Sequence, residues 1–183
     1  MQTRAQYDLA KAFANMFVGA SDRYGIYNWI NGKNKLPEYD SRRKPLTVGL
    51  IAKHLAGEIS LATVLINKDN KCKAGVIDFD DHHNKPEGYK YDYDLLQKKI
   101  KFFNFPLSIV RSKTGGAHAW LLLDKYYPAE WIRYKLKKFA YQLVGHTKVE
   151  LFPKQDTLGP KDFGSLINLP YYKGNSRQLL DLD

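Results

Sequence analysis

The sequence has a single cysteine, no long apolar run and fewer acidic than basic residues. With Cys72 alone in 183 residues, an internal disulfide and a zinc site built on cysteines are excluded, and no zinc is expected. The longest apolar runs, such as residues 117–123, have the length of a strand, whereas a membrane span needs about 20 apolar residues. The N-terminus has no apolar segment behind a basic start, so we expect no signal peptide, a cytoplasmic location and no membrane partner.

A Walker-type glycine-rich sequence ending in Lys-Ser or Lys-Thr is also missing, which excludes an encoded ATPase or helicase of that class. Acids are outnumbered, 19 Asp and Glu against 29 Lys and Arg, so the formal net charge is +10. This excess favours a polyanionic partner, because each neutralised phosphate releases counterions. The 13 Tyr, 9 Phe and 3 Trp are enough to stack against unpaired bases. Composition therefore favours nucleic acid but decides no activity.

Residues 1–72 predict a small N-terminal α/β module. Apolar positions at helical spacing, N-caps and glycines place two helices and two strands in it. A polar stretch at residues 36–45 is predicted to be irregular, and Thr47 and Gly57 are predicted to bound the second helix. The predicted elements are helix 3–17, strand 24–30, helix 48–56 and strand 61–66.

Residues 73–183 predict a more regular second module. Its elements follow the order strand, helix, strand, strand, helix, strand, which is the split βαβ or ferredoxin-like unit. A further strand is predicted at residues 165–168. We therefore predict an α+β fold, with an RRM-like palm and the N-terminal α/β module forming one catalytic unit around a site between them. The palm elements are predicted at 74–80, 91–103, 106–111, 117–123, 128–144 and 149–152.

Two acids end the first palm strand. Asp78 and Asp80 lie two residues apart, so their carboxylates project from one face of a strand. Such oxygen ligands suit Mg²⁺ or Mn²⁺. The alternative is a solvated strand end, although an apolar strand that runs into three acids is unusual in a basic protein.

A second motif surrounds a glycine turn. Ser112 and Lys113 precede the turn at Gly116, and His118 follows it on an apolar strand. Backbone amides in such a turn can bind phosphate, and the side chains can add donors. Taken alone, the segment also fits a plain hairpin with a core histidine.

A third acid, Glu150, stands early on the last palm strand, with Lys154 after it. In the split βαβ order, the first strand is flanked by the third and fourth, both antiparallel to it. Asp78, Asp80, His118 and Glu150 are therefore predicted to converge at one edge of the sheet. Three carboxylates can hold two divalent ions for in-line displacement at phosphorus. His118, Ser112 and Lys113 would then bind the triphosphate.

These motifs carry a resemblance. The segments "DFD", "SKTGGAH" and "ELFPKQD" with "FGSLINLP" resemble the archaeo-eukaryotic primase superfamily, over most of the chain. The likeness extends to primase-polymerase domains of mobile elements and of proteins beside CRISPR integrases. It implies that Asp78, Asp80 and Glu150 are metal ligands and that His118 contacts the incoming nucleotide. Arg23 and Lys154 are further candidates for nucleotide contact.

The resemblance implies a template-dependent nucleotidyltransferase, a primase or DNA polymerase, that uses two Mg²⁺ or Mn²⁺ ions. Its partners would be template-primer or single-stranded DNA, dNTP or NTP, and other domains or a CRISPR integrase in a longer protein.

Two other functions stay open. A replication-initiator nuclease needs two histidines one residue apart on a strand, whereas His82 and His83 are adjacent. A non-catalytic RNA-recognition module would carry aromatic residues where Asp78 and Asp80 stand. The basic residues at 133–138 are interpreted as the solvated face of a helix.

Overall fold

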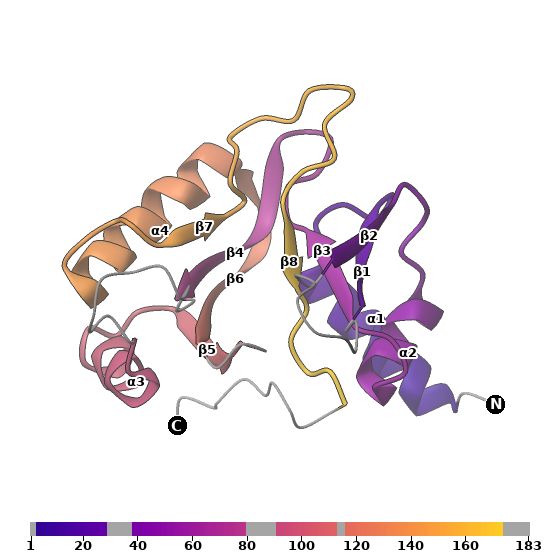
Figure 1. Ribbon diagram of the computed structural model, residues 1–183, viewed down its shortest axis with the longest axis horizontal. Coiled ribbons are helices and arrows are strands. Elements are labelled where there is room, and N and C mark those ends of the chain that lie inside the picture. Colours follow the sequence, from indigo (N-terminus) through magenta and orange to yellow (C-terminus); the bar gives the residue numbers. More distant parts are fainter. Residues whose placement is uncertain (1–2, 29–37, 80–90, 113–115, 174–183) are drawn as a thin grey trace.

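The computed structural model describes residues 3–28, 38–79, 91–112 and 116–173, with the side chains of 28, 38 and 39 left aside. Within these ranges the chain forms two four-stranded antiparallel sheets and four helices. Figure 1 shows the two sheets side by side, each with two of the helices. The predicted mixed α+β class is thus confirmed. No helix in the described ranges has the length and apolarity to cross a membrane.

The first sheet has the strand order β2-β1-β3-β8. Its strands are β1 (Tyr24–Asn28), β2 (Glu38–Arg42), β3 (Leu61–Val64) and β8 (Leu166–Asn168). β2 corrects the prediction of an irregular stretch at 36–45. Its sequence has no apolar face, and it is an edge strand held by backbone pairing to β1. β8 belongs to the C-terminal part of the chain but pairs with β3, so one strand crosses the predicted module boundary at residue 72. The division into two modules stays a prediction.

Helices α1 (Arg4–Phe17) and α2 (Val48–Ala56) begin at local caps. Thr3 forms a capping box with Gln6, and the Thr47 hydroxyl accepts a hydrogen bond from the Leu50 N–H, which satisfies otherwise unpaired amides. Gly57, at φ 81°, ends α2 in a conformation that favours glycine. Both ends of α2 therefore agree with the sequence-based prediction, and α1 begins one residue after the predicted start at residue 3.

The second sheet has the order β5-β6-β4-β7. β4 lies between β6 and β7, as the topological argument predicted. β6 extends beyond the predicted residue 123, because its last residues pair with the start of β4 across an irregularity between Cys72 and Ala74. The bounds are β4 Lys71–Phe79, α3 Tyr93–Phe102, β5 Leu107–Arg111, β6 Ala117–Pro128, α4 Ala129–Val144 and β7 Glu150–Phe152.

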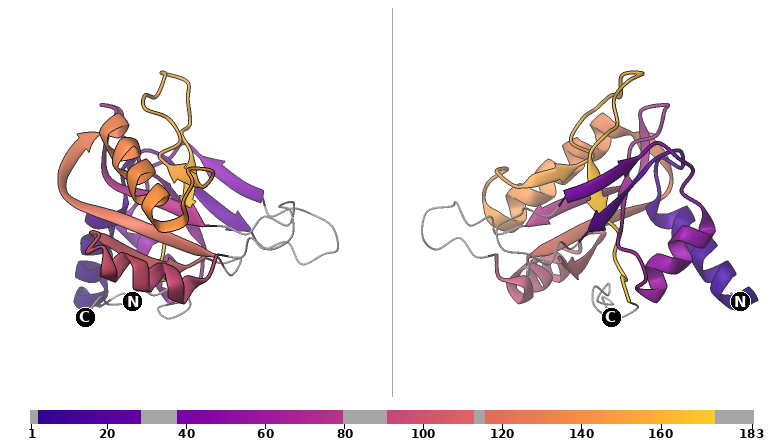
Figure 2. Two further views of the ribbon diagram at one scale, coloured as in Figure 1. Left: turned by 90° about the vertical axis from the view of Figure 1, so that its left-hand side faces the viewer. Right: turned by 45° about the vertical axis from the view of Figure 1, so that its right-hand side comes forward.

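The second sheet is buried on both faces. One face packs on α3 and α4, which lie in front of it in Figure 2, left. Close packing there needs Gly75, where an added Cβ would lie 2.5 Å from a methyl carbon of Ile132. The other face shares a core with α1 and the first sheet. Burial raises the pKa of the Cys72 thiol to about 12, so this cysteine is a neutral core residue at physiological pH.

Candidate active site

Three of the predicted site residues form one row across the second sheet. Asp78 on β4 pairs with His118 on β6 and with Glu150 on β7. Side chains alternate along a strand, and the residues two positions away in the row below, Val76, Trp120 and Phe152, belong to the core shared with the first sheet. The three polar side chains therefore project from the face opposite α3 and α4, on the side of the first sheet.

Asp78 and His118 form the buried part of this row. The Nε2 atom of His118 lies 3.5 Å from Oδ1 of Asp78, and both side chains are less than a tenth exposed. This distance is that of an ion pair when the imidazole is protonated, and it exceeds an ordinary hydrogen bond. A buried carboxylate needs a compensating partner, and His118 is placed to provide one.

Glu150 forms the exposed end of the row. Its carboxylate lies 2.9 Å from the Lys154 ammonium, and both side chains are nearly half exposed. The ammonium also lies 5.0 Å from the centre of the Phe152 ring. An exposed ion pair of this kind contributes about 0–1 kcal/mol. A ligand or metal can therefore displace Lys154 from Glu150 at little cost.

Ser112 and Gly116 lie next to this row, in the connection between β5 and β6. The N–H of Ser112 donates to the carbonyl of Gly116 at 2.9 Å, and the Ser112 side chain is buried. This turn precedes His118 by two residues. The described residues at the two ends of the predicted turn, Ser112 and Gly116, therefore lie near His118, the partner of Asp78. Lys113, between them in the sequence, lies outside the described residues.

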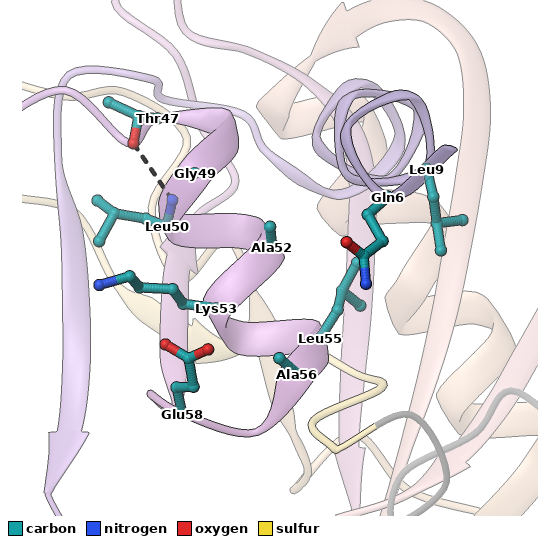
Figure 3. A pocket seen from close by; sticks show the side chains of 10 residues that line it. All are labelled: Gln6, Leu9, Thr47, Gly49, Leu50, Ala52, Lys53, Leu55, Ala56 and Glu58. Carbon is teal, nitrogen blue, oxygen red and sulfur yellow. Dashed lines mark hydrogen bonds between the residues drawn. The ribbon is translucent and has the colours of Figure 1, made fainter. Parts of the chain in front are cut away.

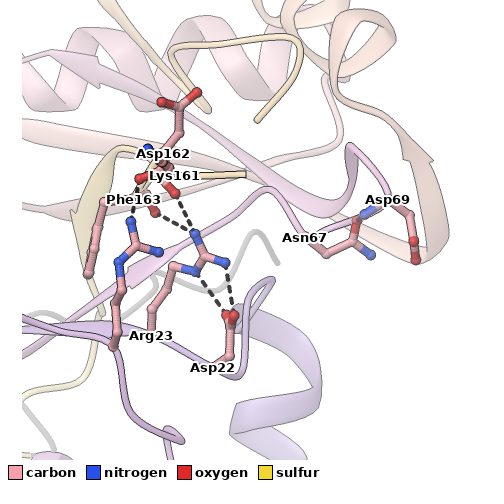
Figure 4. Close-up of polar contacts among 8 residues, drawn as sticks. Asp22, Arg23, Asn67, Asp69, Lys161, Asp162 and Phe163 are labelled. Carbon is pink, nitrogen blue, oxygen red and sulfur yellow. Dashed lines mark hydrogen bonds and ion pairs between the residues drawn. The ribbon is translucent and has the colours of Figure 1, made fainter. Parts of the chain in front are cut away.

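Arg23, predicted to contact nucleotide, is held by other groups (Figure 4). Its guanidinium pairs with both carboxylate oxygens of Asp22, at 2.9 and 2.8 Å, and Nη1 donates to the carbonyls of Asp162 and Phe163. The hydrogen bond to Arg23 lowers the pKa of Asp22, and Asp22 in turn raises the pKa of Arg23. The arginine thus ties the segment before β1 to the segment before β8, and its contact with nucleotide stays a prediction.

The second acid, Asp80, lies outside the described residues, as do His82 and His83. In the ranges that the structure describes, no group of three or more His, Cys, Asp or Glu side chains is placed to hold a metal ion. The test of the expected metal therefore rests on Asp78 and Glu150.

These two carboxylates fit a divalent cation. They face each other directly across β4 and β7, an arrangement of like charges that is destabilising without a cation. Carboxylate oxygens are the ligands that Mg²⁺ and Mn²⁺ prefer. The side chains that contact these carboxylates include His118 and Lys154, both from the chain itself.

Sequence reasoning missed the packing of two further residues, Trp120 beside the row and Arg43 just after β2. Trp120 is fully buried below His118 and packs edge-on against Phe17 of α1 at 5.1 Å; its place two residues after His118 on the same strand face was a usable signal. Arg43 donates to the carbonyl of Lys161 and lies 5.4 Å from the Phe163 ring. An arginine in a loop carries no periodic signal that reveals such a partner.

A pocket of about 810 Å³ lies elsewhere, against α1 and α2 (Figure 3). Most of its lining residues are apolar, with Lys53 and Glu58 as the charged ones. Gln6 and Leu9 line it from α1. Its walls hold none of the predicted site residues, so it is separate from the row centred on Asp78.

A comparison with known families places most of the chain in one family. Residues 9–179 match the family described as "TOTE conflict system, Archaeo-Eukaryotic Primase domain", while no curated protein matches the chain. The matched range contains every predicted site residue and most of the chain. It supports the superfamily resemblance, without a link to CRISPR integrases or mobile elements. The chain therefore belongs to the archaeo-eukaryotic primase domain family of the TOTE conflict system.

Proposed function

We propose that this chain is a template-dependent nucleotidyltransferase, a primase or DNA polymerase, with its active site at the row of Asp78, His118 and Glu150. Family membership supports a primase-like nucleotidyltransferase. The observation that carries the proposal is the register of the second sheet, which sets Asp78 between His118 and Glu150. The strand order β5-β6-β4-β7, with α3 and α4 as crossovers, supports classing this sheet as an RRM-like palm.

Asp78, Glu150 and Asp80, the last known only from the sequence pattern, would hold Mg²⁺ or Mn²⁺. Divalent ions bound there supply activation of the attacking hydroxyl and stabilisation of the leaving pyrophosphate. The carboxylates themselves would determine where a divalent cation binds, because Asp78 is held on a buried strand.

The triphosphate would lie along the turn before β6. His118 and Ser112 offer side-chain donors, and the backbone near Gly116 can approach a phosphate closely. Lys113 and Lys154 add positive charge. Lys154 would leave its exposed ion pair with Glu150 and pair with the phosphates of the nucleotide instead.

The two other functions have no observation in their favour. His118 is the one histidine found on a strand in the described ranges, where a replication-initiator nuclease would need a pair. The neighbouring aromatic residue on the same strand face, Trp120, is buried and is not available to stack on RNA.

Primer extension tests the proposal. A labelled primer-template is incubated with dNTP or NTP, in separate reactions with Mg²⁺, Mn²⁺ or chelator. We expect Asp78→Asn and Glu150→Gln to abolish incorporation, since each removes a ligand charge, and chelator to abolish it in the unaltered protein.

The matched control is Asp124→Asn, which removes the same charge at an exposed position of β6. It should incorporate nucleotide like the unaltered protein. Thermal melts establish that each variant is folded. Full incorporation by folded Asp78→Asn would overturn the metal and active-site assignment.

A further inference from the structure

Helix α4 carries an exposed aromatic and basic stripe on its outer side. The residues, here called the α4 stripe, are Trp131, Tyr134, Lys135, Lys138 and Tyr141. Tyr134 and Lys135 each lie three or four positions from Trp131 and from Lys138, and Tyr141 lies three after Lys138, so all five lie on one side of a helix, over about 15 Å. The side chains of Trp131, Tyr134 and Tyr141 are 36%, 52% and 62% exposed. Large aromatic groups exposed in a row are unusual for a surface with no partner.

Lysines lie over the rings of this stripe. The Lys135 ammonium is 5.2 Å from the centre of the Trp131 ring, and the Lys138 ammonium is 4.6 Å from that of Tyr134. Tyr127, at the end of β6, stacks on Trp131 at 4.7 Å with 18° between the ring planes. The rings are thereby held in defined orientations before any partner arrives.

The surrounding charge is positive. α4 contains four basic residues, Arg133, Lys135, Lys137 and Lys138, and one acid, Glu130. Arg133 is occupied by Asp156 at 2.7 Å. The lysines that accompany the rings thus stay available to an anionic partner.

The α4 stripe is separate from the active-site row. The inner side of α4 buries Ile132, Leu136 and Ala140 against the second sheet. The row of Asp78 projects from the other face of that sheet. Figure 2, left, shows α4 on the near side of the sheet, away from the first sheet.

We propose that the α4 stripe binds single-stranded nucleic acid, as a second contact apart from the active site. Aromatic faces stack on unpaired bases of any sequence, and interleaved lysines neutralise the phosphates between them. A protein partner fits less well, because the centres of protein interfaces are depleted in lysine. The solvated-face interpretation of residues 133–138 accounts for the lysines but not for the exposed rings among them.

Binding of labelled single strands to the full chain tests this inference. Fluorescence anisotropy with oligothymidylate, and with oligouridylate to separate DNA from RNA, gives Kd for Tyr134→Ala/Lys138→Glu. We expect Kd to rise about tenfold, since a lost stacking contact alone costs about fivefold or more.

The control is Tyr7→Ala/Lys11→Glu, which makes the same changes at the same spacing on an exposed face of α1. It measures the effect of net charge alone and should change Kd by less than about twofold. When Asp78→Asn is combined with the stripe variant, the stripe changes should raise Kd by the same factor as in the unaltered protein, because the stripe is separate from the active site.

An abasic strand separates stacking from charge. Tyr134→Ala alone should weaken binding of oligothymidylate and leave binding of the abasic strand unchanged. Equal Kd values for the stripe and control variants would overturn the proposal in favour of a protein partner. An equal loss of binding to the abasic strand would overturn the stacking of bases on Tyr134, on which the proposal depends. Melting curves exclude unfolding as the cause.

Discussion

His54 and His118 are both buried histidines, but their partners differ. His54 accepts the Leu61 N–H at Nδ1 and therefore donates from Nε2 to the carbonyl of Pro170, at 3.1 and 2.8 Å. It joins α2, β3 and the segment after β8. His118 instead points its Nε2 at the carboxylate of Asp78. His54 thus connects three segments of the core, whereas His118 lies beside a carboxylate that is proposed as a metal ligand.

For His118→Asn we expect kcat/KM for nucleoside triphosphate to fall about ten- to a hundredfold. Asparagine can imitate Nδ1 but does not reach as far as Nε2. A lost charge-assisted hydrogen bond to the nucleotide costs about 1.5–3 kcal/mol in the transition state. The measurement is steady-state incorporation over a range of nucleotide concentrations, beside a thermal melt.

His54→Asn is the matched control, because it also removes an Nε2 contact of a buried histidine. It should lower Tm, by about 2–4 °C for each kcal/mol lost, with unchanged incorporation kinetics per folded molecule. If His118→Asn behaves in the same way, His118 belongs to the core and the triphosphate assignment is wrong.

At the scale of elements, two arginines connect segments far apart in the chain. Arg23, before β1, and Arg43, after β2, both donate to carbonyls of residues 161–163. These carbonyls precede β8, the strand that completes the first sheet. The contacts therefore stabilise the return of the C-terminal segment to the N-terminal strands.

Arg23→Ala is expected to lower the free energy of unfolding by about 1.5–3 kcal/mol, the range for hydrogen bonds to charged groups. Urea unfolding measures this change. Arg4→Ala removes an arginine from a solvent-exposed pair with Asp8 and should cost less than about 1 kcal/mol. Equal losses would show that the carbonyl contacts of Arg23 contribute nothing.

The ion pair between Arg23 and Asp22 makes the free energy of unfolding depend on pH. Because Arg23 lowers the pKa of Asp22 below 3.8, the stabilisation from Asp22 is present above that value and is lost as pH falls through the lower folded-state pKa. The loss is small, since the Asp22 side chain is 68% exposed and solvent screens it.

At the scale of the whole molecule, the charge of +10 leads us to expect that nucleic acid binds mainly through electrostatic attraction. We expect Kd for primer-template or single-stranded DNA to rise about ten- to a hundredfold between about 50 and 200 mM salt, as counterion release requires when a few phosphates are neutralised. Two strands of unrelated sequence should bind alike, because phosphate contacts carry no sequence information. Titrations at several salt concentrations measure both. A flat salt dependence would contradict the electrostatic account.

Much of the fold followed from local patterns. Both bounds of the helix 48–56 were predicted correctly, because Thr47 and Gly57 cap it through contacts within one turn. The palm strands and their order followed from apolar runs and the split βαβ rule. The sequence pattern did not predict β2, because this segment is a strand through its backbone pairing with β1 and not through its own side chains. The apolar spacing in residues 3–17 places Leu9 on one helical face with Phe13 and Phe17, yet α1 buries Ala10 with those two rings and leaves Leu9 exposed.

Of the candidate site, the sequence by itself determined the residue types and their strand-end positions. Asp78, His118 and Glu150 were identifiable because carboxylates and a histidine interrupt apolar strands, a local signal. Only the tertiary structure decided their register, the partners of Arg23 and the exposure of the rings on α4. Each of these depends on segments that lie far apart in the sequence. Arg23 and Asp162, for example, are 139 positions apart. The physical reason is that side-chain partners are set by how whole elements pack, whereas caps and periodicities act within one element.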